Sequence, residues 1–232
     1  MPDPRGCAFE LVIFDCDGIL VDSERLAVRV EAQVLQELGW PLTEDEVVDR
    51  FVGRSASYMQ AEVERELGRS IDWDATFAPR HRATYEADLE AVEGVTGVVD
   101  GLRSRGVAIC VASSSTHESI EFKLRRTGLW DAFEGAVFSV EDVAHGKPAP
   151  DVFLHAANKL GAPPEACAVV EDSESGVAAG VAAGMAVFAF AGGVTRAERL
   201  TRPGATVFHE MPELHSLLER TDPVDADGDR RR

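Results

Sequence analysis

Short apolar runs alternate with amphipathic stretches along most of the chain. The apolar runs occupy residues 11–14, 107–112, 136–140, 166–170 and 186–191. Runs that are apolar on both faces are typical of parallel strands covered by helices. Helical patterns occupy the intervals, for example residues 116–127, 150–160 and 173–183. The alternation predicts an α/β core, built on a doubly wound parallel sheet of the Rossmann-like type.

The interval after the first run is too long for a simple crossover. About ninety residues separate Asp17 from the next predicted strand, whereas a crossover connection needs only about a dozen. Apolar residues recur there at helical spacing, with Ser23 expected as the N-cap of the first helix and Gly39 as its end. We therefore expect residues 23–91 to form a small inserted α-helical domain, and residues 1–22 and 92–232 to form a discontinuous core domain.

Polar side chains follow the predicted strands at their carboxyl ends. They are Asp15, Asp17, Ser113, Lys147, Glu171 and Asp172. Open α/β sheets bind their ligands at this edge, in the crevice outside the strand ends. We therefore expect these residues, which are scattered in the sequence, to converge on one site.

The composition narrows the range of partners. The chain of 232 residues has a formal net charge of −18, and its 45% hydrophobic content is ordinary for a globular protein. An acidic surface repels nucleic acids and anionic membranes, so neither is expected as a partner. The same surface repels anionic substrates at long range, so a phosphate site would need local cations, backbone amides or a metal ion.

The cysteines and the first residues bear on the cellular compartment. The four cysteines are far apart and form no Cys-x-x-Cys pair, which argues against a zinc site. Cys16 lies between Asp15 and Asp17, but side-chain alternation turns it away from both, so we expect it to pack in the core. Residues 1–10 hold no apolar leader segment, and no apolar run is long enough to span a membrane. We expect a reduced cytoplasmic protein, either a monomer or a small homo-oligomer.

The acidic residues after two of the strands are candidate metal ligands. Asp15 and Asp17 lie two residues apart, and Asp172 follows Glu171. Nearby carboxylates repel each other, so a buried pair favours a cation beside it. Oxygen ligands of this kind suit Mg²⁺, which keeps several waters and also binds substrate phosphate. Taken alone, the Asp-x-Asp-Gly segment is equally compatible with a turn and a helix cap.

Four polar segments together resemble, in order, the four motifs of the haloacid dehalogenase (HAD) superfamily. They are residues 14–23, 111–114, 146–151 and 169–173. The resemblance extends from Phe9 to about Phe190, and the predicted helical insertion is similar to the cap domain of that superfamily. It implies a phosphotransferase that depends on Mg²⁺ and acts on a small phosphorylated metabolite.

The resemblance also implies catalytic roles. Asp15 would attack phosphorus and form an aspartyl phosphate, while Asp17 would act first as general acid and then as general base. Ser113 would hydrogen-bond the phosphoryl oxygens, and Lys147 would neutralise charge between Asp15 and the phosphate. An anionic nucleophile that approaches a phosphate dianion needs such local positive charge.

The implied Mg²⁺ site uses residues of the first and last motifs. Asp172, the Asp15 carboxylate and the Asp17 backbone carbonyl would hold the ion. Glu171 would lie in or beside the same ligand shell. All of these groups are oxygen donors, the ligand type that Mg²⁺ prefers.

Two features of the sequence narrow the class of reaction within the superfamily. Haloacid dehalogenases lack an acid at the position of Asp17, because halide leaves without a proton, whereas an alkoxide leaving group needs one. Residues 23–91 contain no lysine, which argues against the superfamily branch that forms a Schiff base through a cap lysine.

Residues 17–24 resemble the branch that contains β-phosphoglucomutases and sugar-phosphate phosphatases, such as those acting on 6-phosphogluconate. The mutases carry a histidine where this chain has Ala27, and a lysine and an arginine around the loop where it has Val52 and Ala56. These departures favour a phosphatase for a small sugar or sugar-acid phosphate. A sugar-phosphate mutase is the alternative. A non-catalytic binding protein is a second alternative, against which four intact motifs argue.

Further substrate contacts are expected beside these motifs. Ser114 follows Ser113 at a strand end, where backbone amides can also face a phosphate. Gly53 and Arg54 lie in a predicted turn between cap helices, and family caps reach the site through such a loop; ordinary surface exposure of Arg54 is the alternative. For the basic cluster at residues 80–82, a solvated helix face is favoured over a place in the site.

Overall fold

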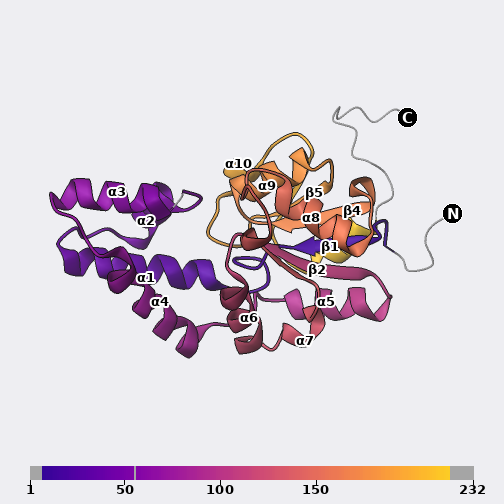
Figure 1. Ribbon diagram of the computed structural model, residues 1–232, viewed down its shortest axis with the longest axis horizontal. Helices are drawn as coiled ribbons and strands as arrows, with labels where there is room; N and C mark the ends of the chain where they lie inside the picture. The colour runs from indigo at the N-terminus through magenta and orange to yellow at the C-terminus, as the bar shows by residue number, and fades with distance from the viewer. Residues whose placement is uncertain (1–6, 55, 220–232) are drawn as a thin grey trace.

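The computed structural model describes residues 7–54 and 56–219, which form a parallel sheet with helices on both faces and a helical lobe beside it (Figure 1). The six strands are β1 (Leu11–Phe14), β2 (Ala108–Ser113), β3 (Val137–Ser139), β4 (Cys167–Glu171), β5 (Ala186–Phe190) and β6 (Ala205–Phe208). Every neighbouring pair is parallel, in the order β3-β2-β1-β4-β5-β6. The predicted doubly wound α/β class is confirmed.

The side chains of β1 alternate between two hydrophobic cores, one on each face of the sheet. Val12 and Phe14 pack with residues of α5 (Val95–Ser104), α6 (His117–Arg126), α7 (Trp130–Phe133) and α11 (Glu213–Leu218). Leu11 and Ile13 pack with residues of α8 (Asp151–Leu160), α9 (Glu174–Ala182) and α10 (Ala197–Leu200). Because helices cover both faces, all four residues of β1 are buried.

The edge strand β6 is absent from the strands that the sequence predicts. It has four residues, of which only Phe208 is fully buried. A short edge strand that is half exposed carries a weaker apolar signal than the buried central strands. Two 3₁₀ turns, at Val140–Asp142 and Pro164–Ala166, complete the connections around the sheet.

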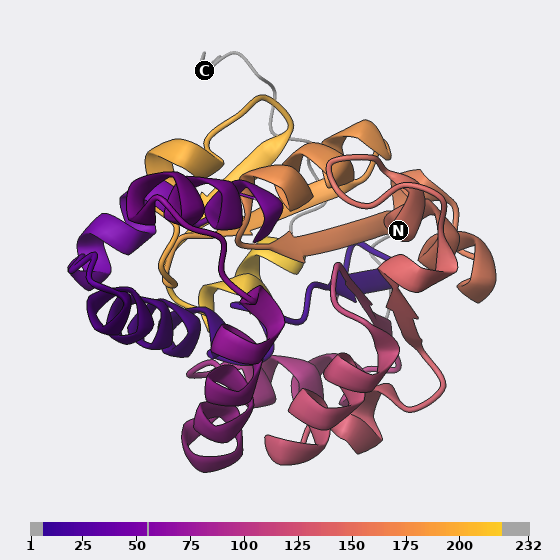
Figure 2. The ribbon, with the colours of Figure 1, turned by 60° about the vertical axis from the view of Figure 1, so that its left-hand side comes forward.

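The residues between β1 and α5 form a helical lobe with a hydrophobic core of its own. The lobe contains α1 (Ser23–Leu38), α2 (Glu44–Phe51), α3 (Ala56–Leu67) and α4 (Trp73–Asp88). Val34, Val47 and Val63 belong to this separate core, and the lobe stands beside the sheet in both views (Figures 1 and 2). We propose that residues 23–91 are a cap domain and that residues 1–22 and 92–232 are the core domain, of which 1–6 and 220–232 lie outside the described residues.

The two chain segments that join the lobe to the sheet run side by side. Val21 forms an antiparallel bridge with Ala91. The backbone N–H of Asp22 donates to the carbonyl of Glu90 at 3.0 Å. The chain therefore leaves and re-enters the core at one place.

The ends of α1 show one error and one success of the sequence-based prediction. Gly39 ends the helix as expected, with a left-handed φ of 98° that favours glycine. Ser23 is not the N-cap, because the cap position is Asp22 and no side chain caps the helix. The Ser23 hydroxyl instead donates to the carboxylate of Asp17.

The cysteines lie in the packed interior. All four are buried and no disulfide joins them, and Cys16 is fully buried, in agreement with a packing role. Within residues 7–54 and 56–219, no helix is both long and apolar enough to cross a membrane.

Candidate active site

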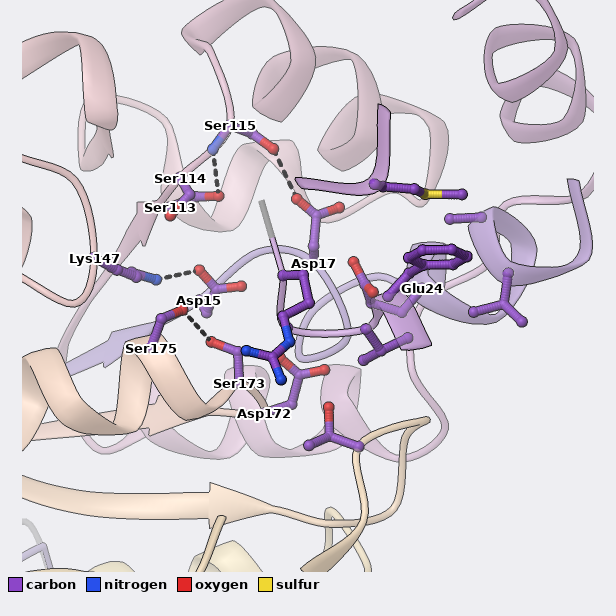
Figure 3. A pocket seen from close by; sticks show the side chains of 18 of the residues that line it. Asp15, Asp17, Glu24, Ser113, Ser114, Ser115, Lys147, Asp172, Ser173 and Ser175 are labelled. Atoms are coloured by element: carbon purple, nitrogen blue, oxygen red, sulfur yellow. Dashed lines mark hydrogen bonds and ion pairs between the residues drawn. The ribbon is translucent and has the colours of Figure 1, made fainter. Parts of the chain in front are cut away.

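A cavity of about 730 Å³ lies at the carboxyl edge of the sheet, between the strand ends and the helical lobe (Figure 3). Every residue that the sequence predicts for the site lines this cavity: Asp15, Asp17, Gly53, Arg54, Ser113, Ser114, Lys147, Glu171 and Asp172. The parallel topology explains the convergence, because β1, β2 and β4 are adjacent and end at the same edge.

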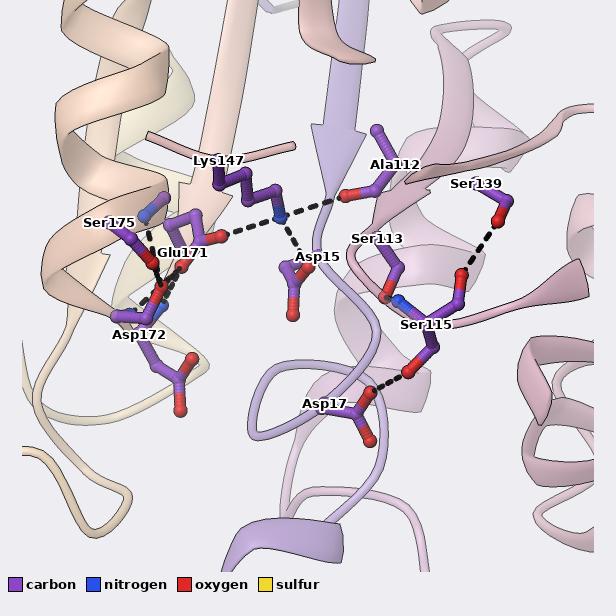
Figure 4. Close-up of polar contacts among 12 residues, drawn as sticks. Asp15, Asp17, Ala112, Ser113, Ser115, Ser139, Lys147, Glu171, Asp172 and Ser175 are labelled. Atoms are coloured by element: carbon purple, nitrogen blue, oxygen red, sulfur yellow. Dashed lines mark hydrogen bonds and ion pairs between the residues drawn. The ribbon is translucent and has the colours of Figure 1, made fainter. Parts of the chain in front are cut away.

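Lys147 connects two carboxylates at the cavity. Its ammonium donates to Asp15 at 2.5 Å, to Glu171 at 2.7 Å and to the Ala112 carbonyl at 3.0 Å (Figure 4). The Lys147 side chain is only 3% exposed. Burial lowers its pKa, but the two carboxylates outweigh burial and raise the pKa above the ordinary lysine value. Lys147 is therefore a fixed positive charge in contact with Asp15.

Asp15 sits directly after β1, where its backbone N–H continues the sheet by donating to the Val170 carbonyl. Burial raises the pKa of Asp15 to about 7, with Lys147 opposing the rise and Glu171 adding to it. Oδ1 accepts the bond from Lys147, whereas Oδ2 has no hydrogen-bond partner among the described residues. When the side chain is ionised, it therefore keeps one oxygen available for phosphorus or for a metal ion.

Glu171 is engaged on both of its oxygens. Oε1 accepts from Lys147, and Oε2 accepts from the backbone N–H groups of Asp172 and Ser173 and from the Ser173 hydroxyl. A Cβ at Gly176 would lie 1.7 Å from Oε1, so a glycine there makes room for the carboxylate. Of the two places that the resemblance allows, these contacts favour one beside the metal ligands, where Glu171 orients Lys147, over one among them.

Asp172 is a buried carboxylate to which no described residue donates a hydrogen bond. It is 4% exposed, and its side chain forms no hydrogen bond or ion pair with any residue in the described ranges. A Cβ at Gly18 would lie 1.9 Å from its Oδ2, so the carboxylate lies against the loop that follows Asp15. Burial, followed by the charges of Glu171 and Glu24, raises its pKa well above the ordinary aspartate value. A carboxylate in this environment is costly unless a cation compensates for it.

The donor set fits Mg²⁺. Asp15 and Asp172 each offer an unbonded carboxylate oxygen, and the Asp17 backbone carbonyl belongs to the same loop. No group of three His, Cys, Asp or Glu side chains that could hold a metal ion occurs within the described residues, so an all-side-chain cage of the zinc or calcium type is not formed there. Mg²⁺ needs no such cage, because it commonly binds one or two carboxylates and completes its shell with waters and substrate phosphate.

Asp17 is held by three donors that sequence reasoning missed. Lys123 donates to Oδ1 at 2.6 Å, Ser115 donates to Oδ2 at 2.8 Å, and Ser23 also donates to Oδ1. Burial alone would raise the pKa of Asp17, but the Lys123 ammonium and these hydrogen bonds outweigh it and lower the pKa below the ordinary value. Asp15 and Asp17 therefore differ in their proton affinity although they are two residues apart.

The sequence does contain a signal for Lys123. It shares the inward face of α6 with Ile120 and Leu124, at spacings of three residues and one residue, and all three are buried. A lysine on an apolar helix face is seldom buried without an acidic partner. The partner, Asp17, lies 106 residues away in the chain and is revealed only by the fold.

The serines after β2 form the opposite wall of the cavity. Ser113 is 1% exposed and its hydroxyl accepts from the backbone N–H of Ser115 at 3.1 Å, so its own hydrogen is free to donate. Ser139 donates to the Ser115 carbonyl at 2.7 Å and holds this loop against β3 (Figure 4). Ser114 is exposed and lines the cavity.

The turn after α2 brings the lobe to the cavity. Gly53 has a left-handed φ of 78°, and a Cβ there would lie 3.2 Å from the guanidinium of Arg199. Arg199 donates to the Val52 carbonyl at 3.0 Å and pairs with Glu174, which fixes the turn to the core. Arg54 is exposed at this turn, lines the cavity, and lies over the ring of Tyr58 at 5.6 Å.

The basic cluster on α4 divides between surface and cavity. Arg80 pairs with Glu37 and Arg82 with Glu86, all on the exposed surface. His81 instead lines the cavity, so a solvated face describes only two of the three residues. The helical period explains the division, since residues one position apart point about 100° from each other.

Comparisons with known proteins agree on one family. The family model described as haloacid dehalogenase-like hydrolase matches residues 9–184. One similar solved structure is a HAD family hydrolase from Deinococcus radiodurans with bound phosphate and sodium. It is 32% identical in sequence, has a TM-score of 0.81, and its match covers 91% of this chain and 96% of the Deinococcus chain.

Two curated relatives come from Escherichia coli K12. The 6-phosphogluconate phosphatase is 29% identical over 211 residues, which cover 90% of this chain and 94% of the relative. Hexitol phosphatase B is 32% identical over 188 residues, which cover 75% of this chain and 79% of the relative. The chain is thus similar over most of its length to phosphatases with different substrates.

Proposed function

The chain belongs to the haloacid dehalogenase-like hydrolase family and is a phosphoric monoester hydrolase. We propose that it uses Mg²⁺ and forms an aspartyl phosphate on Asp15 to hydrolyse a small sugar or sugar-acid phosphate. One observation carries the proposal. Asp15 contacts the buried cation Lys147 through one oxygen and keeps the other unbonded at the cavity. A nucleophile that attacks a phosphate dianion needs this combination of a free oxygen and adjacent positive charge.

In the first step, the unbonded Asp15 oxygen attacks phosphorus, and the bond from phosphorus to the alkoxide oxygen breaks. Asp17, in its carboxylic acid form, gives its proton to that oxygen. In the second step, the Asp17 carboxylate takes a proton from water, which attacks phosphorus and releases Asp15 and inorganic phosphate. The bonds from Lys123, Ser115 and Ser23 stabilise the carboxylate form, which the second step requires.

The phosphoryl group has donors on two sides. The Ser113 hydroxyl and the backbone of Ser114 would bind its oxygens from the end of β2, and Lys147 would offset its charge. Asp15, Asp172 and the Asp17 carbonyl would hold Mg²⁺, which when bound supplies positive charge between the nucleophile and the phosphate. We propose that Gly53 and Arg54 contact the rest of the substrate from the cap.

The test is a phosphate-release screen over small phosphomonoesters with Mg²⁺, followed by phosphorus NMR. Inorganic phosphate should accumulate from at least one sugar phosphate, and Asp15→Asn should lose at least about a thousandfold in kcat, because an amide does not attack phosphorus. A positional isomer that forms without free phosphate would identify a mutase instead. Undiminished hydrolysis by Asp15→Asn would exclude the proposed nucleophile.

A further inference from the structure

One face of α1 places two glutamates in the cavity, on the side that the helical lobe forms. Glu24, Ala27, Val28 and Glu31 recur at helical spacing and all line the cavity. Glu24 is seen in Figure 3 with its carboxylate directed toward the space beside Asp17. The non-phosphate part of a substrate would therefore lie against this acidic helix face.

Neither glutamate has a partner among the described residues. No hydrogen bond or ion pair reaches the side chain of Glu24 or Glu31, whereas Glu37 on the same helix pairs with Arg80. Burial and then the charge of Asp17 raise the pKa of Glu24 to about 7, and burial and then Glu24 raise that of Glu31 to about 8. With pKa values near or above neutrality, both carboxyls take up a proton readily at neutral pH, and in either form each keeps an oxygen that can accept a hydrogen bond.

His81 is a third polar side chain of the cavity wall, and it is neutral. Its Nε2 atom is buried and has no hydrogen-bond partner, although the ring lines the cavity. Burial, aided by the charge of Lys123, lowers the pKa of His81, so the ring is neutral and suited to an uncharged hydroxyl. A buried polar atom without a partner is unusual unless a ligand or water completes it.

The cations of the cavity do not favour a second anionic group on the substrate. Lys147 is already bonded to Asp15 and Glu171. Among the described residues that line the cavity, Arg54 is the one further lysine or arginine, and it is exposed at the rim. The buried cation Lys123 lowers the pKa of Glu24 but is already paired with Asp17. A second anionic group deep in the cavity would therefore meet Glu24 and Glu31 with no unpaired buried cation among the described lining residues.

We infer that the substrate is a sugar or polyol phosphate whose distal part is rich in hydroxyl donors and carries no second anionic group. Glu24 and Glu31 accept its hydroxyls, and the neutral ring of His81 lines the same cavity without adding a charge. This inference rests on the proposed phosphatase function and, within it, selects neutral sugar phosphates over sugar-acid phosphates. A cavity of about 730 Å³ is within the range that holds small ligands.

The test compares sorbitol 6-phosphate with 6-phosphogluconate, which differ only in a hydroxymethyl or carboxylate group at the far end. We expect kcat/KM to favour sorbitol 6-phosphate by at least tenfold, equivalent to about 1.4 kcal/mol. A second pair, glucosamine 6-phosphate and glucose 6-phosphate, should show no penalty for the ammonium group. Equal or better turnover of 6-phosphogluconate would overturn the inference.

Variants on α1 assign the discrimination to its residues. Glu31→Gln should lower the ratio of the two kcat/KM values at least fivefold, whereas the matched exposed variant Glu37→Gln should leave the ratio unchanged. An unchanged ratio in both Glu31→Gln and Glu24→Gln would also overturn the inference.

The same assay distinguishes failure of this inference from failure of the proposed phosphatase function. If p-nitrophenyl phosphate is hydrolysed but neither sorbitol 6-phosphate nor glucose 6-phosphate is, the phosphatase stands and the inference fails. If no phosphomonoester is hydrolysed, the proposed function fails and the inference with it.

Discussion

At the scale of single residues, the site separates two aspartates by their surroundings. Asp15 is buried beside other carboxylates, and its pKa is raised to about 7. Asp17 is bonded by Lys123 and two hydroxyls, and its pKa is lowered. The lowered pKa of Asp17 favours the carboxylate that acts as base in the second step, and a cation bound beside Asp15 would favour the ionised form that the nucleophile requires.

Lys123→Met should weaken both the fold and the second chemical step. Removing one partner of a buried ion pair typically costs about 3–5 kcal/mol of unfolding free energy. Because the folded-state pKa of Asp17 is lowered, the pair stabilises the fold above the unfolded aspartate pKa of about 3.9. The loss should therefore be full at neutral pH and shrink as the pH falls through the folded-state pKa of Asp17.

Urea unfolding of wild type and Lys123→Met at several pH values measures this loss. The kcat should also fall at least about tenfold, and Lys123→Arg should restore part of it because the guanidinium can still bond Asp17. Equal stability of wild type and Lys123→Met across the pH range would contradict the structural role of this pair.

Asp172→Asn should stabilise the fold in the absence of metal and abolish the phosphatase activity. Since burial raises the Asp172 pKa, its ionisation opposes folding at pH values above that of an unfolded aspartate. In EDTA the variant should therefore be more stable at neutral pH by about 1–2 kcal/mol, or about 2–8 °C in Tm, with a gain that grows as the pH rises. Mg²⁺ should raise the Tm of wild type but not of the variant, which should be inactive; a wild-type Tm that ignores Mg²⁺ would argue against the metal site.

At the scale of elements, the sequence correctly predicted the strands and the helix end that have a distinctive local pattern of apolar residues. The buried runs of β1, β2 and β4 and the end of α1 at Gly39 followed from side-chain patterns. The edge strand β6 did not, because it is short and three of its four residues are only partly buried, which leaves a weak apolar pattern. Periodicity alone thus locates central elements better than peripheral ones.

The candidate site divides in the same way. Motif residues such as Asp15 and Lys147 were predicted because their spacing is distinctive. Lys123 and Glu24 were missed, and His81 was assigned to a solvated face, because each owes its place to a contact or cavity between elements distant in sequence. Such residues become visible only when the sheet edge and the lobe are placed together.

The turn after α2 gives a prediction at the element scale. Arg54→Ala should raise KM for a sugar phosphate more than tenfold if the guanidinium bonds substrate oxygens, because hydrogen bonds to charged groups contribute about 1.5–3 kcal/mol. An aryl phosphate that lacks those oxygens should be almost unaffected. Arg69→Ala, an exposed arginine of the lobe outside the cavity, is the matched control; equal effects of Arg54→Ala on both substrates would make Arg54 structural.

At the scale of the whole molecule, a strongly acidic chain must attract a dianion. The formal net charge is −18, so the positive charge that the substrate meets is confined to the sheet edge. Long-range repulsion slows the encounter and is screened by salt, with a Debye length of about 10 Å at 0.1 M. With Mg²⁺ saturating, kcat/KM should therefore rise modestly, about twofold, between low salt and 0.15 M NaCl. Steady-state kinetics in a salt series measure this, and a steep fall would indicate that local cations dominate the encounter.

Detection of the phosphorylated nucleophile tests the central proposal most directly. Asp17→Asn should still accept a phosphoryl group from p-nitrophenyl phosphate, whose leaving group needs little protonation, but should lack the base that activates water. Acid quenching and mass spectrometry should then find one added phosphoryl group, about 80 Da, on the peptide that contains Asp15, and only when Mg²⁺ is present. A phosphoryl group on another residue, or continued turnover with Asp15 unmodified at every time point, would contradict the aspartyl-phosphate mechanism.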